Sequence, residues 1–519
     1  MNDAPPNSET LPVSPAAPPL GGHVVRGSIW MMMNTVVGKS ASLIAQIVLA
    51  WVLTKEDFGV FATASSAAVF ATFLRDGGVR DLLIQRQAEY PRLLGPIFWL
   101  ACWMNLLCGL LVVLIGAALA FGLQKPIYFW MLLIIGSSVP INTLPSILSA
   151  RLNIELRFQE LSIVQIAAAL VRYGGSVGFA IAGFGPMAFV LPLPAMAIVE
   201  WIMLRRYVKD RPWREPPHSG LWWDLLKSAK WILLGTLGVA LVNMGNYSVV
   251  RIFVNETVVG IYFFAYQIVA QVGILVAANM NQILFAAFAR IDEPERLRRA
   301  LDKSLRQLMF FAVPTGLVLI PVFPGLERWL WQGRWDSAVP TVLIIAVFYP
   351  LTVVNAVPYA ALKAWGRFRA WALLLAALGV AVLASGMLGA WLGGTAEWIG
   401  LSSSVTLAIG CMGMVWLALR RIHVGLISIL KNTLPAYLVG LIAAGAGWLI
   451  DSELSALPHM QFGLGALGRA TIAAATFTLI YGALATVLLR PHIHEAIQVL
   501  PARLRNVAMR ITLLREAHA

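Results

Sequence analysis

Three basic side chains fall in or at the end of long apolar stretches of this sequence: Lys39, Arg172 and Arg251. An ionised group at the centre of a bilayer costs about 2.5–3.5 kcal/mol or more, so it is expected to face water, a counter-charge or a ligand. Lys39 is too central in its stretch to reach the membrane surface easily. We therefore expect Lys39 to face a cavity and to bind an anionic group, with a structural pair to a carboxylate such as Glu200 as the alternative.

The two arginines have two interpretations each. Arg172 lies within the fifth apolar stretch, where it either lines the cavity or has a structural role. Arg251 ends the seventh stretch, from which a long side chain either lines a cavity or extends to the membrane surface. We predict a cationic cavity formed by Lys39, Arg172 and Arg251, whose chemistry is the electrostatic binding of an anion.

Further polar side chains in or beside the apolar stretches are candidates for the rest of the cavity lining. Intramembrane amides hydrogen-bond neighbouring helices, and they can equally bind sugar hydroxyls in a water-filled cavity. For any single amide the contact between helices is favoured. The candidates are Asn34, Glu200, Asn243, Asn246, Asn279 and Asn355.

Residue types that carry covalent or metal chemistry are not grouped in this sequence. The three cysteines lie in apolar stretches and show no metal-ligand spacing, and none of the seven histidines has a metal-ligand partner at helical spacing. The segment Gly38-Lys39-Ser40 resembles the end of a phosphate-binding loop, but Met33 stands where that loop needs a glycine. We therefore predict no catalytic residue, no metal and no cofactor.

The elements that must position these side chains are membrane-spanning helices. Of the 519 residues, 59% are hydrophobic and only 12% charged, and the mean hydropathy is +0.76. The apolar stretches are about 20 residues long and lack strict alternation, which favours helices over a barrel. The sequence predicts an all-α, polytopic bundle of about 14 transmembrane helices.

The placement of basic residues predicts the orientation. Of the 39 lysines and arginines, two fall within spans and six on one side of the predicted bundle, which leaves 31 on the side of the amino terminus. Because basic residues gather in cytoplasmic loops, we predict cytoplasmic amino and carboxyl termini and a bacterial inner-membrane location. The net charge of +14 then reflects topology and affinity for anionic inner-leaflet lipids, and nucleic acid is not expected as a partner.

The predicted organisation has six parts. A short repeat, Phe58-Gly59-Val60-Phe61 and Val259-Gly260-Ile261-Tyr262, favours two pseudo-symmetric six-helix lobes in parallel orientation. We predict a disordered cytoplasmic tail over 1–24, a first lobe over 25–206, a cytoplasmic linker over 207–230, a second lobe over 231–419, two further helices over 420–489 and a basic amphipathic cytoplasmic tail over 490–519. The last segment has apolar residues at steps of three and four, typical of a helix on a membrane surface.

Three short segments carry a resemblance to a known family. Residues 53–61, 74–78 and 83–86 read LTKEDFGVF, LRDGG and LIQR, and Arg157-Phe158 follows the fourth span. These resemble the amino-terminal signature and a connector of the polysaccharide transporter family, which holds the O-antigen and exopolysaccharide flippases. That family belongs to the multidrug, oligosaccharidyl-lipid and polysaccharide exporter superfamily.

The resemblance implies a fold and a function. The fold would be a V-shaped pair of six-helix lobes with two extra carboxyl-terminal helices. The function would be the flipping of an undecaprenyl-pyrophosphate-linked oligosaccharide to the outer leaflet by alternating access, through a central cationic cavity. Lys39 matches the expected basic residue by its position in the first helix, whereas no motif brackets Arg172 or Arg251. The implied partners are a polyprenyl-pyrophosphate-linked glycan, a polysaccharide polymerase and glycosyltransferases.

Two other functions stay open at this point. A drug or cation exporter of the same superfamily would want a buried carboxylate in its first lobe, where Glu200 is the only acid near a span. A membrane-embedded polysaccharide polymerase or ligase would want a sizeable external loop with catalytic residues, and the predicted external loops are short.

Overall fold

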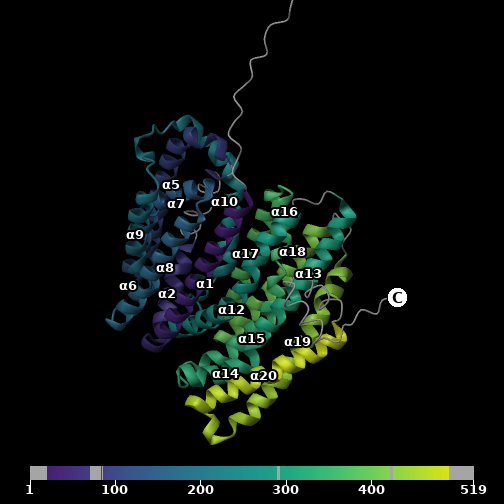
Figure 1. Cartoon of the computed structure of the whole chain (residues 1–519). Coiled ribbons are helices and arrows are strands. Elements are labelled where there is room, and N and C mark those ends of the chain that lie inside the picture. The colour runs from purple at the N-terminus through teal and green to yellow at the C-terminus, as the bar shows by residue number, and fades with distance from the viewer. Residues whose placement is uncertain (1–19, 70–82, 85, 289–292, 421–424, 490–519) are drawn as a thin grey trace, which may run out of the picture.

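The computed structural model describes residues 20–69, 83–84, 86–288, 293–420 and 425–489, and the regular elements among them are all helices. The first lobe is on the left of Figure 1 and the second on the right. The helices of the first lobe are α1 (Leu20–Val52), α2 (Lys55–Ala67), α5 (Tyr90–Gly122), α6 (Ile127–Ile141), α7 (Thr143–Ile154), α8 (Phe158–Ile181) and α9 (Pro192–Tyr207), with short helical turns η1 (Gln87–Glu89) and η2 (Gly185–Phe189).

The linker and the second lobe follow. The linker contains η3 (Pro212–Arg214) and η4 (Ser219–Leu221). The helices of the second lobe are α10 (Trp222–Met244), α11 (Tyr247–Val250), α12 (Glu256–Phe288), α13 (Pro294–Leu317), α14 (Leu319–Leu330), α15 (Val339–Val353), α16 (Ala356–Ala364), α17 (Phe368–Gly393) and α18 (Ala396–Leu419), with η5 (Asp336–Ala338) before α15. The described part of the chain ends with α19 (Leu426–Ser455), η7 (Pro458–Met460) and α20 (Gly463–Leu488).

The protein is a multi-pass, all-α membrane bundle, as the sequence predicts. In the described part of the chain, 10 helices are long and apolar enough to cross a membrane, or up to 12 when each bent pair is one span. The predicted number of fourteen is compatible with this set. Outside this set, the described chain has α2, with 13 residues, the single turn α11 and the long helix α12. We call the end at which α1 begins the near end, and the end at which α1 stops the far end.

Helix breaks in the bundle coincide with prolines and polar residues. The axes of α6 and α7 differ by 43° across a break at Asn142, two residues after Pro140. In the second lobe, α15 ends at Val353 and α16 begins at Ala356, between Pro350 and Pro358. Proline lacks the backbone N–H that continues a helix and clashes with the preceding turn, which accounts for breaks at these places.

The two lobes repeat each other, which confirms the predicted pseudo-symmetry. Thr54 caps the start of α2 by accepting from the Asp57 backbone N–H at 3.1 Å. Asn255 caps α12 in the same way by accepting from the Val258 N–H at 3.0 Å. A second equivalence lies in the connectors that precede α8 and α17, where Leu156 and Gly366 both adopt positive φ (55° and 66°) and an Arg-Phe pair follows each.

The lobes meet where α2 crosses α12. A Cβ built on Gly59 would collide with the Glu256 backbone, and one built on Gly260 would collide with the Lys55 backbone, both well inside the 3.0 Å that real Cβ contacts respect. The repeated motif is therefore also the crossing point, since the two equivalent glycines let the backbones of the two helices touch.

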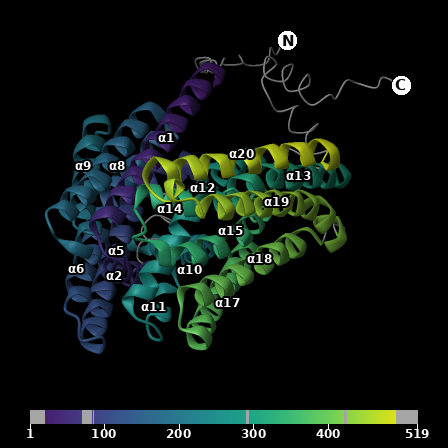
Figure 2. The same ribbon diagram turned by 90° about the horizontal axis from the view of Figure 1, so that it is seen from below.

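The last two helices extend the second lobe. Helices α19 and α20 pack on each other and on α13 and α14, and Figure 2 shows them running along that side of the bundle. Arg469 Nε lies 2.8 Å from Asp451 Oδ1, and this buried ion pair joins α20 to α19.

The predicted domain boundaries stay a prediction, and the one between residues 230 and 231 falls within α10. Residues 20–24, which the sequence assigns to the tail, belong to α1. The amphipathic tail over 490–519, residues 1–19 and the motif residues 74–78 and Gln85 lie outside the described residues.

Candidate functional site

A cavity of about 360 Å³ lies between the two lobes. One face of α1 provides a wall: Lys39, Ser42, Gln46 and Leu49 recur at steps of three and four and all line the cavity. Helix α8 packs along α1 and adds Arg172, whose guanidinium carbon lies 5.5 Å from the centre of the Tyr173 ring. The cavity therefore contains two of the three cations that the sequence predicts.

The two cations carry uncompensated positive charge in the described structure. Lys39 is half-buried and Arg172 exposed, and among the described residues neither forms an ion pair with a carboxylate. The 18 lining residues include no Asp or Glu. A pair of fixed positive charges with no acid beside them attracts an anion more strongly than bulk water would allow, because the surrounding wall is of low dielectric.

The opposite wall comes from the second lobe and is uncharged. Helix α10 contributes Asn243 and Met244, and α12 contributes Tyr266, Gln267 and Gln271 among others. Gln271 Nε2 donates to Ser42 Oγ at 2.9 Å, which links the two walls. Gln46 is only 8% exposed, and its Nε2 has no hydrogen-bond partner in the described structure. These amides offer donors and acceptors to a neutral polar group.

Aromatic side chains form the floor of the cavity on the side of the far end. Phe61 stacks on Phe189 with ring centroids 4.2 Å apart, and Phe58 meets Phe189 edge-on at 5.2 Å. Leu49 and Phe263 complete the floor. Along α1 the lining thus changes from a cation at Lys39, through the amide of Gln46, to apolar side chains, so polarity falls from the near end to the far end.

A loop of the second lobe closes the far end by capping α1. The indole N–H groups of Trp331 and Trp335 donate to the carbonyls of Ile47 and Ala50 at 3.2 and 3.0 Å. Arg334 donates to the carbonyls of Trp51 and Leu53. The last carbonyls of a helix have no partner within the helix, and a cation there complements the helix dipole.

Ion pairs at the far end add to this closure. Lys125 Nζ in the α5–α6 connection lies 2.8 Å from Glu56 Oε1 and 3.1 Å from Glu256 Oε1. The hydrogen bond to Glu56 raises the pKa of Lys125, and burial opposes that rise. Lys125 therefore stays charged and joins its own lobe to the start of α12.

The structure does not bring Arg251 to the cavity lining. Its Nη2 lies 2.6 Å from Glu256 Oε1, and its Nη1 donates to the Val254 carbonyl at 2.9 Å. Arg251 is thus part of the far-end ion cluster. Glu200 lies half-buried on α9 and is not among the cavity-lining residues.

The predicted amides divide between cavity and helix contacts. Asn243 lines the cavity. Asn34 donates to Gln165 Oε1 at 2.7 Å, and Asn246 donates to Tyr262 Oη and Ser403 Oγ, so both connect helices. Asn355 lies at the break before α16. Asn279 is in α12, and its side chain lies outside the described residues.

Several lining residues are absent from the sequence prediction. Gln46, Gln267 and Gln271 were not singled out, and neither was Ser176 or Tyr266. The spacing of Lys39, Ser42 and Gln46 on α1 is a signal that could have found Gln46, since these positions share a helical face. The lining residues from α12 could not be predicted without knowing how the two lobes are arranged.

Comparison with known proteins gives consistent relatives. The family described as polysaccharide biosynthesis protein matches residues 48–340. The lipopolysaccharide biosynthesis protein WzxC of Escherichia coli K12 is 22% identical over 62% of this chain and 66% of its own length. The teichuronic acid biosynthesis protein TuaB of Bacillus subtilis 168 is 23% identical over 82% of this chain and 90% of its own length.

Solved structures share the fold. A structure of the lipid II flippase MurJ in an inward closed conformation superposes with a TM-score of 0.69 at 13% identity, over 90% of this chain and 100% of that one. An inward-facing multidrug resistance transporter of the MATE family and MOP superfamily gives a TM-score of 0.57 at 14% identity, over 77% of this chain and 98% of that one. At these identities the likeness concerns the fold.

Proposed function

The chain belongs to the polysaccharide biosynthesis protein family, and from that membership we propose that it moves a lipid-linked oligosaccharide across the bacterial inner membrane. The cargo is an O-antigen or exopolysaccharide repeat unit on undecaprenyl pyrophosphate. The observation that carries the proposal is the pair of cations, Lys39 and Arg172, in a cavity between two lobes whose described lining residues include no acid.

The chemistry of the cargo explains why this cavity would be needed. A bare pyrophosphate cannot enter hydrocarbon, because an unpaired ion loses its hydration there at a cost of many kcal/mol. Fixed positive charges in a wet cavity compensate that loss, while the polyprenyl tail stays in the bilayer. No bond is made or broken, so the role needs no catalytic residue.

The decrease in polarity along α1 would orient the cargo within the cavity. The pyrophosphate would bind at Lys39 and Arg172, and the first sugars would extend toward the amides of Gln46 and Gln271. Hydroxyl groups match amides, which donate and accept hydrogen bonds. The apolar floor offers no partner to a polar group in this state, so release would require the far end to open, as alternating access demands.

The lining disfavours the competing transport function. A carrier of organic cations would need an acidic group in the cavity, and the lining has two cations and no acid. The MATE-like fold alone does not restore that function, because one fold serves different cargoes.

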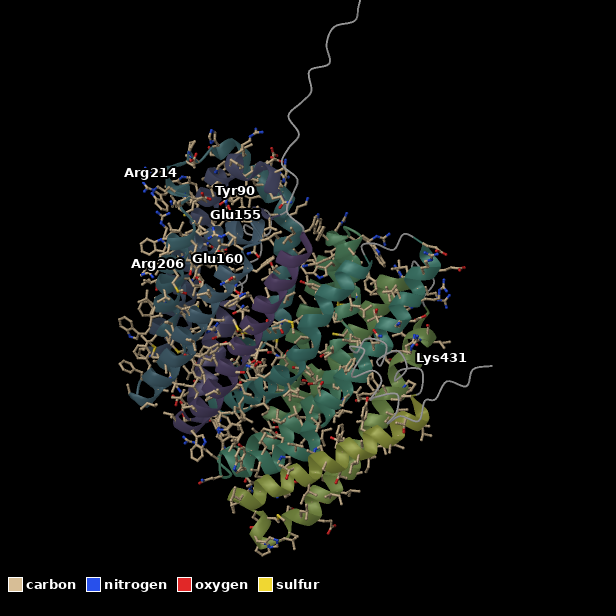
Figure 3. All side chains as sticks on the ribbon, viewed as in Figure 1. Tyr90, Glu155, Glu160, Arg206, Arg214 and Lys431 are labelled. Carbon is tan, nitrogen blue, oxygen red and sulfur yellow. The ribbon has the colours of Figure 1, made fainter. Side chains whose placement is uncertain are left out.

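The orientation that this function requires places the near end in the cytoplasm. Arg214 in η3 and Arg298 in α13 are exposed at that end, and Figure 3 shows Arg214 at the same end as Tyr90 and Glu155. Reporter fusions at Arg214 and Arg298 are expected to give a cytoplasmic signal, because basic residues gather on that side of the membrane. A periplasmic signal at either position would overturn the orientation.

A deletion strain tests the function itself. Loss of the gene is expected to leave the lipid-linked repeat unit in the cytoplasmic leaflet and to stop the appearance of the polymer outside. The measurement is the leaflet distribution of the lipid-linked glycan, probed in intact cells and in inverted membrane vesicles, with the complemented strain as control. An unchanged distribution together with normal polymer would reject the proposal.

The proposal includes partners that act before and after the flip. Glycosyltransferases build the repeat unit on its carrier, and a polysaccharide polymerase consumes it on the other side. Anionic lipids of the inner leaflet would bind the basic segment 490–519, which lies outside the described residues.

A further inference from the structure

One carboxylate in the second lobe is buried and has no ion pair among the described residues. Glu327, near the end of α14, is 0% exposed. Its Oε1 accepts from the Trp335 backbone N–H at 2.7 Å, and its Oε2 has no hydrogen-bond partner in the described structure. An ionised carboxylate with a single donor in such a place loses most of its hydration without compensation.

A second carboxyl group lies beside it. Asp336 directly follows Trp335, whose backbone N–H donates to Glu327, and it pairs with Arg328, the residue next to Glu327. Two neighbouring carboxylates repel each other when both are ionised, so one of them favours binding a proton. Because Asp336 is exposed and has the arginine, the proton belongs on Glu327.

The other charged groups around Glu327 are already paired. Arg328 is held by Asp336 and lies over the Phe462 ring, 5.2 Å from its centre. On the helices packed against α14, Asp451 and Arg469 pair with each other. Arg334 donates to the carbonyls at the end of α1, and Lys55 Nζ donates to Ser337 Oγ at 2.8 Å. None of these leaves a cation for the Glu327 carboxylate within the described residues.

The loop that Glu327 supports is the loop that closes the far end. Trp335, whose N–H the carboxyl group holds, is fully buried, stacks on Phe264 at 3.9 Å and meets Phe58 of the first lobe at 5.1 Å. The Trp335 indole N–H donates to the Ala50 carbonyl on α1. Separation of the lobes at the far end would break the contacts of the Trp331–Ala338 loop with α1 and α2 and would expose the carboxyl pair beneath it to water.

We propose that Glu327 and Asp336 form a proton-binding site that links closure of the far end to the uptake of one proton from the far-side solution. On closing, hydronium gives its proton to the Glu327 carboxylate and leaves as water. On opening, the hydrated carboxyl group returns the proton to water on the same side. Acid on the far side therefore favours the closed far end, and alkaline solution favours the open one.

The test measures the far-end distance in the full chain, without any lipid-linked cargo. Spin labels are placed at Gln124 of the first lobe and Thr395 of the second, both exposed at the far end, after replacement of the three native cysteines. The protein is reconstituted in phospholipid nanodiscs, and distances are measured from about pH 5 to about pH 9, a range that covers shifted carboxyl pKa values. The otherwise native protein is expected to gain long distances as the pH rises.

Two substitutions and a control decide the outcome. Glu327→Gln copies the protonated acid, so its far end is expected to stay closed with no change across the pH range. Asp336→Asn removes the neighbouring negative charge that favours a proton on Glu327, and its transition is expected about one pH unit lower or more. Glu453→Gln, the same change at an exposed site on α19, is expected to titrate like the native protein. A native titration in Glu327→Gln, or no titration in the native protein, overturns the proposal.

Discussion

Lys39→Ala is expected to stop export of the glycan while the protein still inserts and folds. The lysine supplies one of two fixed charges in the cavity, and a hydrogen bond to a charged group contributes about 1.5–3 kcal/mol, which is about tenfold or more in cargo binding. Because Lys39 is half-buried and carries no structural ion pair among the described residues, its removal leaves no orphaned carboxylate to unfold the protein. The measurement is surface polymer in a deletion strain that carries the variant.

Matched variants separate charge from packing. Lys39→Arg keeps the charge and is expected to retain part of the export. Lys431→Ala removes a lysine that is exposed on α19, away from the cavity (Figure 3), and is expected to leave export unchanged. Full export by Lys39→Ala at normal protein level would remove Lys39 from the binding site.

Gly260→Ala is expected to force the two lobes apart at the far end. The added methyl group would collide with the Lys55 backbone, and a backbone cannot rotate away as a side chain can. Overpacking of this kind costs about 1–3 kcal/mol. Because α2 and α12 belong to different lobes, the cost falls on the closed far end, and its population should drop by up to about a hundredfold. Spin labels at Gln124 and Thr395 would report longer distances, and export would fall.

The equivalent glycine and a distant one serve as controls. Gly59→Ala should reproduce the effect, because its methyl group would meet the Glu256 backbone. Gly413→Ala on α18 has nothing within 4 Å of the new methyl group, so it should be neutral or slightly stabilising through the lower entropy of the unfolded chain. Unchanged far-end distances in Gly260→Ala would show that the crossing can relax without separating the lobes.

The sequence identifies helices well and their mutual contacts poorly. Long apolar stretches, and one lysine within such a stretch, suffice to predict the bundle and to single out Lys39, because both follow from the cost of placing polar groups in hydrocarbon. Arg172 lines the same cavity, yet the sequence leaves it undecided, since a helix face is defined only by its neighbours. Whether either cation binds cargo stays a prediction.

Arg251 shows why the contacts of the other candidate residues could not be predicted from the sequence. Its ion-pair partner, Glu256, is only five residues away in the sequence, and the pair forms because the chain turns between α11 and α12. Lys125, from the distant connection between α5 and α6, contacts the same carboxylate. The repeat of Gly59 and Gly260 was visible in the sequence as an equivalence. The contact between the equivalent residues depends on how the two pseudo-symmetric lobes are arranged in space. The sequence alone does not specify that arrangement.

The capping of α1 by Trp331, Arg334 and Trp335 leaves the side chains at the end of α1 free to vary. These three side chains recognise carbonyl oxygens of residues 47, 50, 51 and 53, and every amino acid presents the same oxygen. Side chains at the end of α1 can therefore drift through evolution without breaking the seal, as long as the helix ends at the same turn. Only the residues of the second lobe that make these bonds are constrained in their identity. An insertion of one residue in α1 would disrupt the far-end closure more than many substitutions there.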